Sequence, residues 1–342
     1  MDIIVLCGGL SAERDVSLSS GTLAAAALRR RGHRAILVDL FFGYTGAYDD
    51  PREIFAHANE IQNTINDALP DLAALRAARA DGSRVGENVV EVCRAADLVF
   101  IALHGEDGED GKIQALLDLY GVKYTGTGTL GSALGMNKGV AKELFAQNGI
   151  RTPRGILVHS GDNAPANVGF PCVVKPCSRG SSVGTSVVED ESGYRDALNA
   201  AFAFEDTAIV EQYIRGRECD VAVLRGKALP VIEICPRAGF YDYKNKYQSG
   251  MTDEYCPADF PPETTEKLQR AAEAVFRALH FEVYARMDFI VDASGEPWCL
   301  EGNTLPGLTP LSLMPQEAAA VGISYDELCD IIVTESLKKY GG

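Results

Sequence analysis

The first forty residues constrain the fold more than any other part of the chain. Asp2–Cys7 is a continuous apolar run, as expected for a strand buried on both faces, and Gly8 and Gly9 end it. Val16–Arg31 then has the pattern of a helix, and Ala35–Leu40 has that of a second strand. A strand, a helix and a strand in this order predict a βαβ unit, and therefore a parallel sheet.

The length and composition indicate a globular protein of several domains. The chain has 342 residues, of which 46% are apolar and 23% are charged. This apolar content excludes extensive disorder, and no apolar run reaches the ~18–20 residues of a membrane-spanning helix. Acidic residues outnumber basic ones 48 to 32, so the net charge of −16 gives no general attraction for a nucleic-acid backbone. We therefore expect no nucleic-acid partner and no membrane partner.

The cysteines and the N-terminal segment indicate the compartment. Nine cysteines are scattered without a CxxC pair, and several lie in apolar runs, where a reduced cysteine acts as a small hydrophobic residue. The segment MDIIVLCGG has no basic stretch before its apolar run, so we expect a strand there rather than a signal peptide. Both features predict a cytoplasmic protein.

A glycine-rich stretch, TGTGTLGSALG, predicts a domain boundary between Thr125 and Lys138. Before it, Leu98–Leu103 is predicted to be another buried strand of the parallel sheet. Glu53–Leu69 and Leu72–Ala80 are predicted to be helices at the edge of the first domain.

After this boundary the predicted strands are short and separated by turns, as in an antiparallel sheet. Ile209–Ile214, Glu218–Leu224 and Leu229–Ile234 are predicted to belong together in this way. Phe240–Pro257 is polar and aromatic, and we expect a surface loop there. An amphipathic helix, a hairpin and two closing helices complete the chain. They cover Thr264–Leu279, Val283–Val291 with Glu296–Glu301, and the residues after Ser312.

A loop rich in glycine and serine is the first candidate site. In VVKPCSRGSSVGTSVV a predicted strand ends at Lys175 and the loop follows. A second strand then begins where a P-loop or a dinucleotide-binding fold would have a helix. Glycines let backbone N–H groups close around phosphate oxygens, and the lysine adds a positive charge. The same residues are typical of an ordinary hairpin turn, so a phosphate site and a plain turn both stay open here.

Three oxygen donors converge on the predicted hairpin. Glu301 and Asn303 are two residues apart and so face the same side of a strand, while Asp288 lies on the partner strand. Such oxygens suit Mg²⁺, which usually shares its ligands with phosphates. Their apolar neighbours disfavour the alternative, that they are solvated strand residues. Arg286, two residues before Asp288, is predicted to share its strand face.

Other polar residues flank predicted strands. Glu211 and Glu218 lie in EQYIRGRE and could hold an adenosine, although a solvated face is the default interpretation. Glu13 precedes the first helix, where a helix-start carboxylate and a ligand contact are about equally supported. His104 follows a buried strand, at the end where open α/β sheets bind ligands.

Taken together, these motifs resemble the D-alanine–D-alanine ligases of the ATP-grasp superfamily. The matching segments are GGLSAERDVSLSSG, HGEDGEDGKIQ, KPCSRGSSVG, GFYDYKNKY and RMDFI with EGNTLPGLTPLSL, between Ile3 and about Leu337. The resemblance implies an α/β protein with an N-terminal parallel α/β (pre-ATP-grasp) domain over residues 1–130. An ATP-grasp fold of two α+β subdomains would follow, with a central one over 131–214 and a catalytic one over 215–342.

The resemblance also implies the reaction and the residues that perform it. ATP would phosphorylate the carboxylate of one D-alanine, and the amine of a second would attack the acyl phosphate to give D-alanyl-D-alanine for peptidoglycan. Catalytic roles fall on Glu13, Ser181, Tyr247, Arg286 and Gly307, and substrate contacts on His104, Glu109, Ser312 and Leu313. ATP contacts fall on Lys138, Lys175, Glu211, Tyr213, Ile214, Glu218 and Lys246. Asp288, Glu301 and Asn303 would hold Mg²⁺ (or Mn²⁺), with two ions expected.

Three alternatives remain at this point. A ligase that makes D-alanyl-D-serine or D-alanyl-D-lactate would share all these motifs. A non-catalytic ATP-binding module would need no oxyanion donor such as Arg286. A dehydrogenase would need GxGxxG after the first strand, where the sequence reads CGGLSAE. For the ligase we expect D-alanine and ATP as ligands, and a homodimer.

Overall fold

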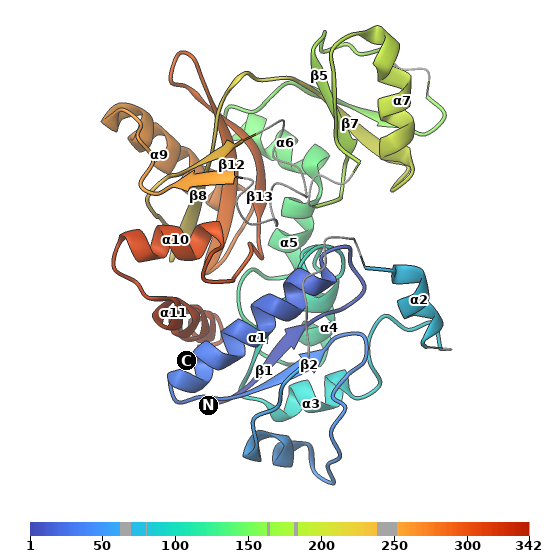
Figure 1. Cartoon of the computed structure of the whole chain (residues 1–342), viewed down its shortest axis with the longest axis vertical. Coiled ribbons are helices and arrows are strands. Elements are labelled where there is room, and N and C mark those ends of the chain that lie inside the picture. Colours follow the sequence, from blue (N-terminus) through green and yellow to red (C-terminus); the bar gives the residue numbers. More distant parts are fainter. Residues whose placement is uncertain (62–69, 80, 163–164, 181–183, 238–251, 342) are drawn as a thin grey trace.

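The computed structural model describes residues 1–61, 70–79, 81–162, 165–180, 184–237 and 252–341. Three sheets follow one another along the chain, each with helices packed against it (Figure 1). The first sheet is parallel, and the other two are antiparallel. The predicted fold class is therefore confirmed, while the domain limits at residues 130 and 214 stay predictions.

The first sheet has the strand order β2-β1-β3, and β1 is buried along almost its whole length. Its strands are β1 (Asp2–Cys7), β2 (Arg34–Asp39) and β3 (Leu98–Ile101). The helices of this region are α1 (Arg14–Arg30), α3 (Val89–Ala95) and α4 (Lys112–Leu119). The βαβ unit predicted from the first forty residues is present, and its helix begins two residues earlier than predicted.

The segment between β2 and α3 differs from the prediction. Within the described residues, the helix predicted over Glu53–Leu69 is wrong: Pro51–Ala56 forms a short 3₁₀ helix (η1), and residues 57–61 are not helical. The chain leaves the helix because the Asn59 side chain pairs with β2 instead. Its amide oxygen accepts from Leu37 N and its amide nitrogen donates to Leu37 O, both at 2.8 Å. Residues 62–69 lie outside the described part, and α2 (Leu72–Ala77) ends earlier than predicted.

The turn after β1 is held by a buried ion pair. Arg14 and Asp39 form this pair, and Arg14 Nη1 also donates to Gly9 O at 2.7 Å. Gly8 has a φ of 73°, and a Cβ at this position would lie 2.5 Å from Asp39 Oδ2, so only glycine fits. The clamped turn fixes where α1 begins, and therefore where Glu13 lies.

Helix α1 approaches the first sheet closely at Gly21. A Cβ there would lie 2.6 Å from the Cβ of Cys7, which is fully buried. We expect Gly21→Ala to lower the free energy of unfolding by about 1–3 kcal/mol, because the helix must move away from the sheet. Gly193→Ala is the control. A methyl group there meets only an ordinary contact at 3.6 Å, so this change should stabilise the helix by up to about 1 kcal/mol. Urea unfolding of both variants measures the difference, and equal effects would contradict the close approach.

The second sheet has the order β4-β7-β5-β6, with α7 packed on one face. Its elements are β4 (Gly155–His159), β5 (Cys172–Pro176), β6 (Ser186–Val188), α7 (Glu191–Phe202) and β7 (Thr207–Gln212). The grouping predicted for Ile209–Ile214 is therefore wrong, because this strand does not pair with the two that follow it. Its buried residues Ala208 and Val210 pack in the core beneath α7 instead.

The third sheet has the order β11-β10-β8-β12-β13, and β9 pairs with β8. Its strands are β8 (Gly216–Leu224), β9 (Lys227–Ala228), β10 (Ile232–Pro236), β11 (Thr252–Tyr255), β12 (Tyr284–Asp292) and β13 (Pro297–Asn303). Helix α9 (Pro262–Ala278) covers it, and α5 (Thr129–Met136) and α6 (Lys138–Gln147) lead towards it. The surface loop predicted over Phe240–Pro257 is corrected at its end, where β11 pairs with β10; residues 240–251 lie outside the described part.

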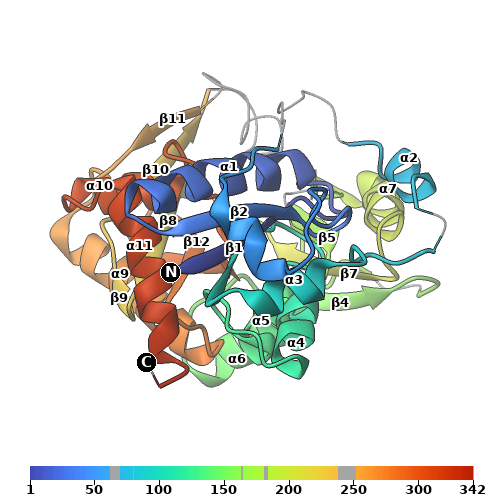
Figure 2. The same ribbon diagram turned by 90° about the horizontal axis from the view of Figure 1, so that it is seen from below.

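The C-terminal helices return to the N-terminal sheet. Helix α10 (Leu313–Ala320) precedes α11 (Tyr325–Lys338), which lies beside α1 (Figure 2). Buried residues of α11 belong to the same hydrophobic core as β1, β2 and β3. Arg30 pairs with Asp326, and both Arg31 and His33 pair with Asp330. The two ends of the chain are therefore stabilised by the same core.

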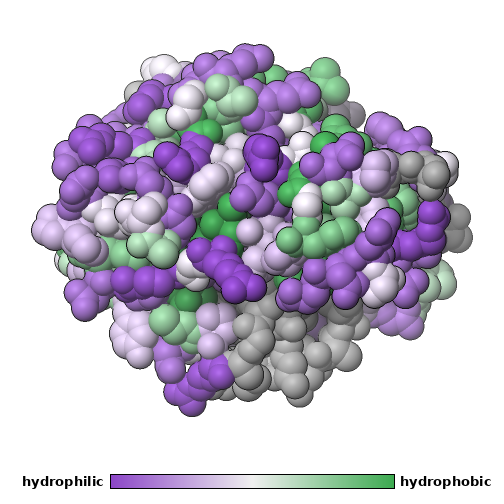
Figure 3. Space-filling view, turned by 90° about the horizontal axis from the view of Figure 1, so that it is seen from above, coloured by the Kyte–Doolittle hydropathy of each residue, from purple (hydrophilic) through white to green (hydrophobic). Residues whose placement is uncertain are grey.

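Hydrophilic residues dominate the face seen from above, and the hydrophobic residues visible there form small separate patches (Figure 3). In the described part of the chain, no helix has both the length and the apolar character needed to cross a membrane.

Candidate active site

A cavity of about 440 Å³ lies between the second and third sheets. One wall comes from β5, β6 and β7, and the other from β8, β10, β12 and β13. Most of the residues predicted to bind ATP or metal line this cavity together. They are Lys138, Lys175, Glu211, Tyr213, Ile214, Glu218, Asp288 and Glu301.

A buried carboxylate joins two lysines at the wall formed by β5 and β7. Lys175 Nζ lies 3.0 Å from Glu211 Oε2, and Lys142 Nζ lies 3.1 Å from Glu211 Oε1. Burial alone would raise the pKa of Glu211, but the charges of Lys175 and Lys142 outweigh it and hold the pKa below its usual value. Glu211 is therefore an ionised carboxylate inside the protein. Lys142 is absent from the sequence prediction, although it lies four residues after Lys138 and so on the same helix face.

Lys138 connects the glycine-serine loop to the third sheet. Its Nζ lies 2.9 Å from Glu301 Oε2 and donates to Arg179 O at 2.8 Å. Burial would lower the pKa of Lys138, but the neighbouring Glu301 charge raises it above the ordinary lysine value. The ammonium group therefore stays charged at the point where the loop meets the cavity.

Three carboxylates form a row across the third sheet. In the register of the neighbouring strands, Asp220 on β8 lies opposite Asp288 on β12, and Asp288 lies opposite Glu301 on β13. A β-bulge follows Asp288, and such irregularities often re-aim a side chain next to a site. Asp220 was not predicted, yet an acidic residue inside the apolar run CDVAVL is the signal that could have found it.

Arg286 balances this row of carboxylates. Its Nε lies 2.8 Å from Asp220 Oδ2 and 2.9 Å from Asp288 Oδ1, and its Nη2 donates to Asp288 Oδ2 at 2.9 Å. A guanidinium held by two carboxylates keeps a fixed orientation. Arg286 is therefore an oriented positive charge beside Asp288, which lines the cavity.

The donors predicted for a metal fit a hard divalent cation. Asp288 and Glu301 lie directly opposite each other, and Asn303 Oδ1 accepts from Leu305 N at 3.1 Å, which orients its amide. Among the described residues, no group of three or more His, Cys, Asp or Glu side chains could hold a metal ion. The predicted ligands are thus two carboxylates and one amide. A divalent cation bound to them would keep further coordination positions for phosphate oxygens.

A second group of predicted residues lies where the first sheet faces the cleft. Ser11 Oγ donates to His104 O at 2.8 Å, which holds the turn before α1 against the HGEDGEDG loop. Glu13 and Glu109 are both largely buried there. Burial, and then the charge of Glu13, raises the pKa of Glu109 well above its usual value. Gly180 of the glycine-serine loop reaches the same place, since a Cβ there would lie 3.3 Å from Glu13 Oε2.

His104 is held on both ring nitrogens. Nδ1 lies 2.9 Å from Leu305 O, and Nε2 lies 3.0 Å from Ser20 Oγ. Burial lowers the pKa of His104, so the ring is neutral: Nδ1–H donates to the carbonyl and Nε2 accepts from the hydroxyl. The imidazole therefore connects α1 to the segment after β13.

The residues predicted for the second substrate lie at the start of α10. A Cβ on Gly307 would be 3.0 Å from Ser312 Oγ, so these two residues are neighbours. Ser312 Oγ accepts from Thr309 N at 3.0 Å, and Leu313 is the first residue of the helix. Ser181, Lys246 and Tyr247 lie outside the described residues, so the structure does not place them.

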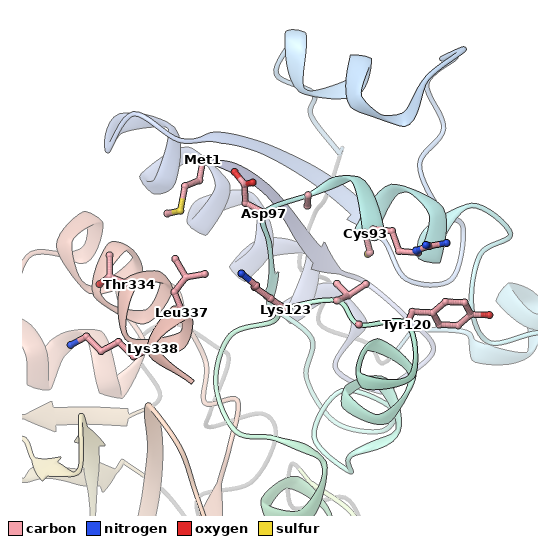
Figure 4. A pocket seen from close by; sticks show the side chains of 12 residues that line it. Met1, Cys93, Asp97, Tyr120, Lys123, Thr334, Leu337 and Lys338 are labelled. Atoms are coloured by element: carbon pink, nitrogen blue, oxygen red, sulfur yellow. The ribbon is translucent and has the colours of Figure 1, made fainter. Parts of the chain in front are cut away.

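A larger hollow, of about 910 Å³, lies elsewhere on the molecule (Figure 4). Thr334, Leu337 and Lys338 of α11 face Lys123 across it, and Tyr120 lies at another side. None of the predicted site residues lines this hollow. Cavity size alone would therefore have selected the wrong place.

Comparison with known proteins gives the family. The family model described as D-ala D-ala ligase N-terminus matches residues 2–127, and the one described as D-ala D-ala ligase C-terminus matches residues 154–334. The chain belongs to the D-alanine–D-alanine ligase family. The predicted relation to ATP-grasp ligases is thus confirmed.

Relatives of this family match the chain along its whole length. The D-alanine–D-alanine ligase of Pediococcus pentosaceus is 43% identical over 99% of both chains. That of Halalkalibacterium halodurans is 41% identical over 99% of this chain and 100% of its own. A solved D-alanine–D-alanine ligase from Bacillus anthracis, complexed with ATP, has a TM-score of 0.78 at 30% identity over 100% of both chains. The VanG D-Ala:D-Ser ligase from Enterococcus faecalis has a TM-score of 0.76 at 28% identity over 98% of both.

Proposed function

We propose that this family member joins two D-alanine molecules into D-alanyl-D-alanine and converts ATP to ADP and phosphate. The observation that carries the proposal is the set of charges in one cavity. Lysines suited to phosphates and two carboxylates suited to a divalent cation line it, and Arg286 is held against one of those carboxylates, Asp288. A module that only bound ATP would need no such arginine. The names of the relatives, D-alanine–D-alanine ligases at about 40% identity over their full length, support the same reaction.

ATP would lie between the second and third sheets. Lys138 and Lys175 would contact the phosphates. The adenosine would be held by Glu211, Tyr213, Ile214 and Glu218, which line the same cavity. Lysines beside transferred phosphates neutralise their charge. Lys246, also assigned to phosphate, lies outside the described residues. A non-polar wall from Val173, Ile234 and Ile290 suits a flat base.

Ligases of this family use ATP with divalent metal ions. Asp288, Glu301 and Asn303 would hold Mg²⁺ or Mn²⁺ here, with two ions as our expectation. The bound cation would neutralise the phosphates and help to orient the transferred phosphoryl group.

The reaction proceeds in two steps on the substrates. A carboxylate oxygen of the first D-alanine attacks the γ-phosphorus, and ADP leaves. The amine nitrogen of the second D-alanine then attacks the carbonyl carbon of the acyl phosphate and forms a tetrahedral oxyanion. Phosphate leaves as hydrogen phosphate, which accounts for the proton that the nitrogen loses. Arg286 and the Gly307 N–H would stabilise the tetrahedral oxyanion that exists after the amine has attacked and before phosphate leaves.

Binding of the two amino acids would be divided between the two sides of the cleft. Glu13 would hold the ammonium of the first D-alanine near His104 and Glu109. Ser312 and Leu313 would hold the second one. Ser181 and Tyr247, which we assign to orienting the glycine-serine loop, lie outside the described residues.

The product would supply peptidoglycan precursors in the cytoplasm. All nine cysteines are free, which is typical of a reducing compartment. We also propose a homodimer, which sedimentation of the purified protein would test.

The decisive experiment measures phosphate release with ATP, Mg²⁺ and D-alanine, and identifies the product by mass. We expect D-alanyl-D-alanine. Equimolar D-serine or D-lactate in competition tests the alternatives within the family, and a predominance of either mixed product would contradict the proposal. ATP binding without phosphate release would indicate the non-catalytic module instead.

A further inference from the structure

Lys142, Glu211 and Lys175 form a cluster of charges in which Glu211 is buried and the two lysine side chains are only 10% and 11% exposed. Glu211 is only 2% exposed, and each of its carboxylate oxygens faces one ammonium group. Lys175 and Glu211 belong to strands β5 and β7, which pair directly, and Lys142 comes from α6 behind them.

The two lysines have different surroundings. Lys142 Nζ donates to Thr152 Oγ1 at 2.7 Å and to Pro153 O at 2.8 Å, in addition to its pair with Glu211. Two of its three donors are used by these two hydrogen bonds, and its charge lies 3.1 Å from Glu211 Oε1 without a hydrogen bond to that oxygen. Lys142 does not line the cavity, so it cannot touch the nucleotide.

Lys175, unlike Lys142, can reach a ligand in the cavity. It lines the cavity, and its one partner among the described residues is Glu211 Oε2 at 3.0 Å. Two of its three donors therefore remain for a ligand. Its ability to attract an anion depends on how much of its charge Glu211 neutralises.

We propose that Lys142 is a positioning residue for nucleotide binding, which shares the Glu211 carboxylate so that Lys175 keeps its charge for the phosphates. Two ammonium groups and one carboxylate leave one net positive charge in this buried cluster. Without Lys142, the remaining pair is neutral and Lys175 binds Glu211 alone. In the unmodified protein, Glu211 is a charge anchor that both lysines share. This inference rests on the nucleotide site proposed above and deepens it.

The test compares ADP and adenosine, each with Mg²⁺, by calorimetry on the full-length protein. Lys142→Met should raise the Kd of ADP about 10-fold or more, because the neutral pair attracts phosphate weakly. The Kd of adenosine should stay within about 2-fold, because no contact to the base is lost. Lys227→Met, an exposed lysine on β9, is the control and should change neither value.

A double variant separates this role from a merely structural one. Glu211→Gln alone leaves two buried ammonium groups without a carboxylate. Lys142→Met combined with Glu211→Gln restores a single positive charge on Lys175, so ADP affinity should return to within about 3-fold of the unmodified protein. Thermal melting checks that each variant is folded.

The binding measurements distinguish a failure of the Lys142 role from a failure of the nucleotide site. Additive losses in the double variant, or an equal loss of adenosine affinity, would overturn the role of Lys142 while leaving the nucleotide site in place. A protein with unmodified sequence that failed to bind ADP would overturn the site itself, and with it this inference.

Discussion

Replacing Arg286 by alanine should lower kcat by about 100-fold or more and change KM little. The reason is that the guanidinium is fixed between Asp220 and Asp288 and, in our proposal, would stabilise the negative oxygen that develops in the reaction. An interaction made only in the transition state affects kcat, whereas one made equally in the ground state affects KM. Steady-state rates with varied D-alanine measure both parameters. A change confined to KM would contradict the role.

The variant removes the cation beside two buried carboxylates, so its folding needs a separate check. Arg286→Lys keeps the positive charge but loses the bidentate contact with Asp288. Its kcat should lie between that of the unmodified protein and that of Arg286→Ala. Arg270→Ala removes an exposed arginine on α9 and should have no effect on kcat. A normal melting transition together with a low kcat would locate the effect in the reaction.

Glu301→Gln should remove most turnover, by more than about 100-fold at low Mg²⁺. The change keeps the size of the side chain but removes the negative charge that would hold the divalent cation opposite Asp288. It also leaves Lys138 without its ionised partner at 2.9 Å. Turnover measured across a series of Mg²⁺ concentrations tests the assignment.

The matched control for this change lies on the same hairpin. Glu296→Gln removes a carboxylate that pairs with Lys267 and Arg151, outside the cavity. Its turnover should stay near normal at every Mg²⁺ concentration. If the Glu301 variant behaved in the same way, the metal assignment would be wrong.

Much of the site could be predicted because its residues follow local patterns. The hairpin around residues 292–295 places Asp288 opposite Glu301, and the period of two along a strand places Arg286 beside Asp288. The glycine-serine loop likewise stands between two predicted strands. In each case the predicted site residues are near one another in sequence, or lie on two strands that one short turn connects.

Other parts of the site could not be read from such patterns. Lys142 contacts Glu211 from a helix sixty-nine positions earlier, and the order of residues does not reveal this contact. Asp220 joins the carboxylate row only because β8 pairs with β12 and not with β7.

The sequence by itself determined the βαβ start, most of the separate strands and helices, and the family, since these depend on periodicity and on motifs read along the chain. The tertiary structure alone decided which strands share a sheet, that α11 packs on α1 in the core of the first sheet, and which charges are buried together. The physical reason is that periodicity shows which face of an element is apolar, but many surfaces can cover that face. A buried charge requires a partner, yet the requirement does not say where along the chain that partner lies.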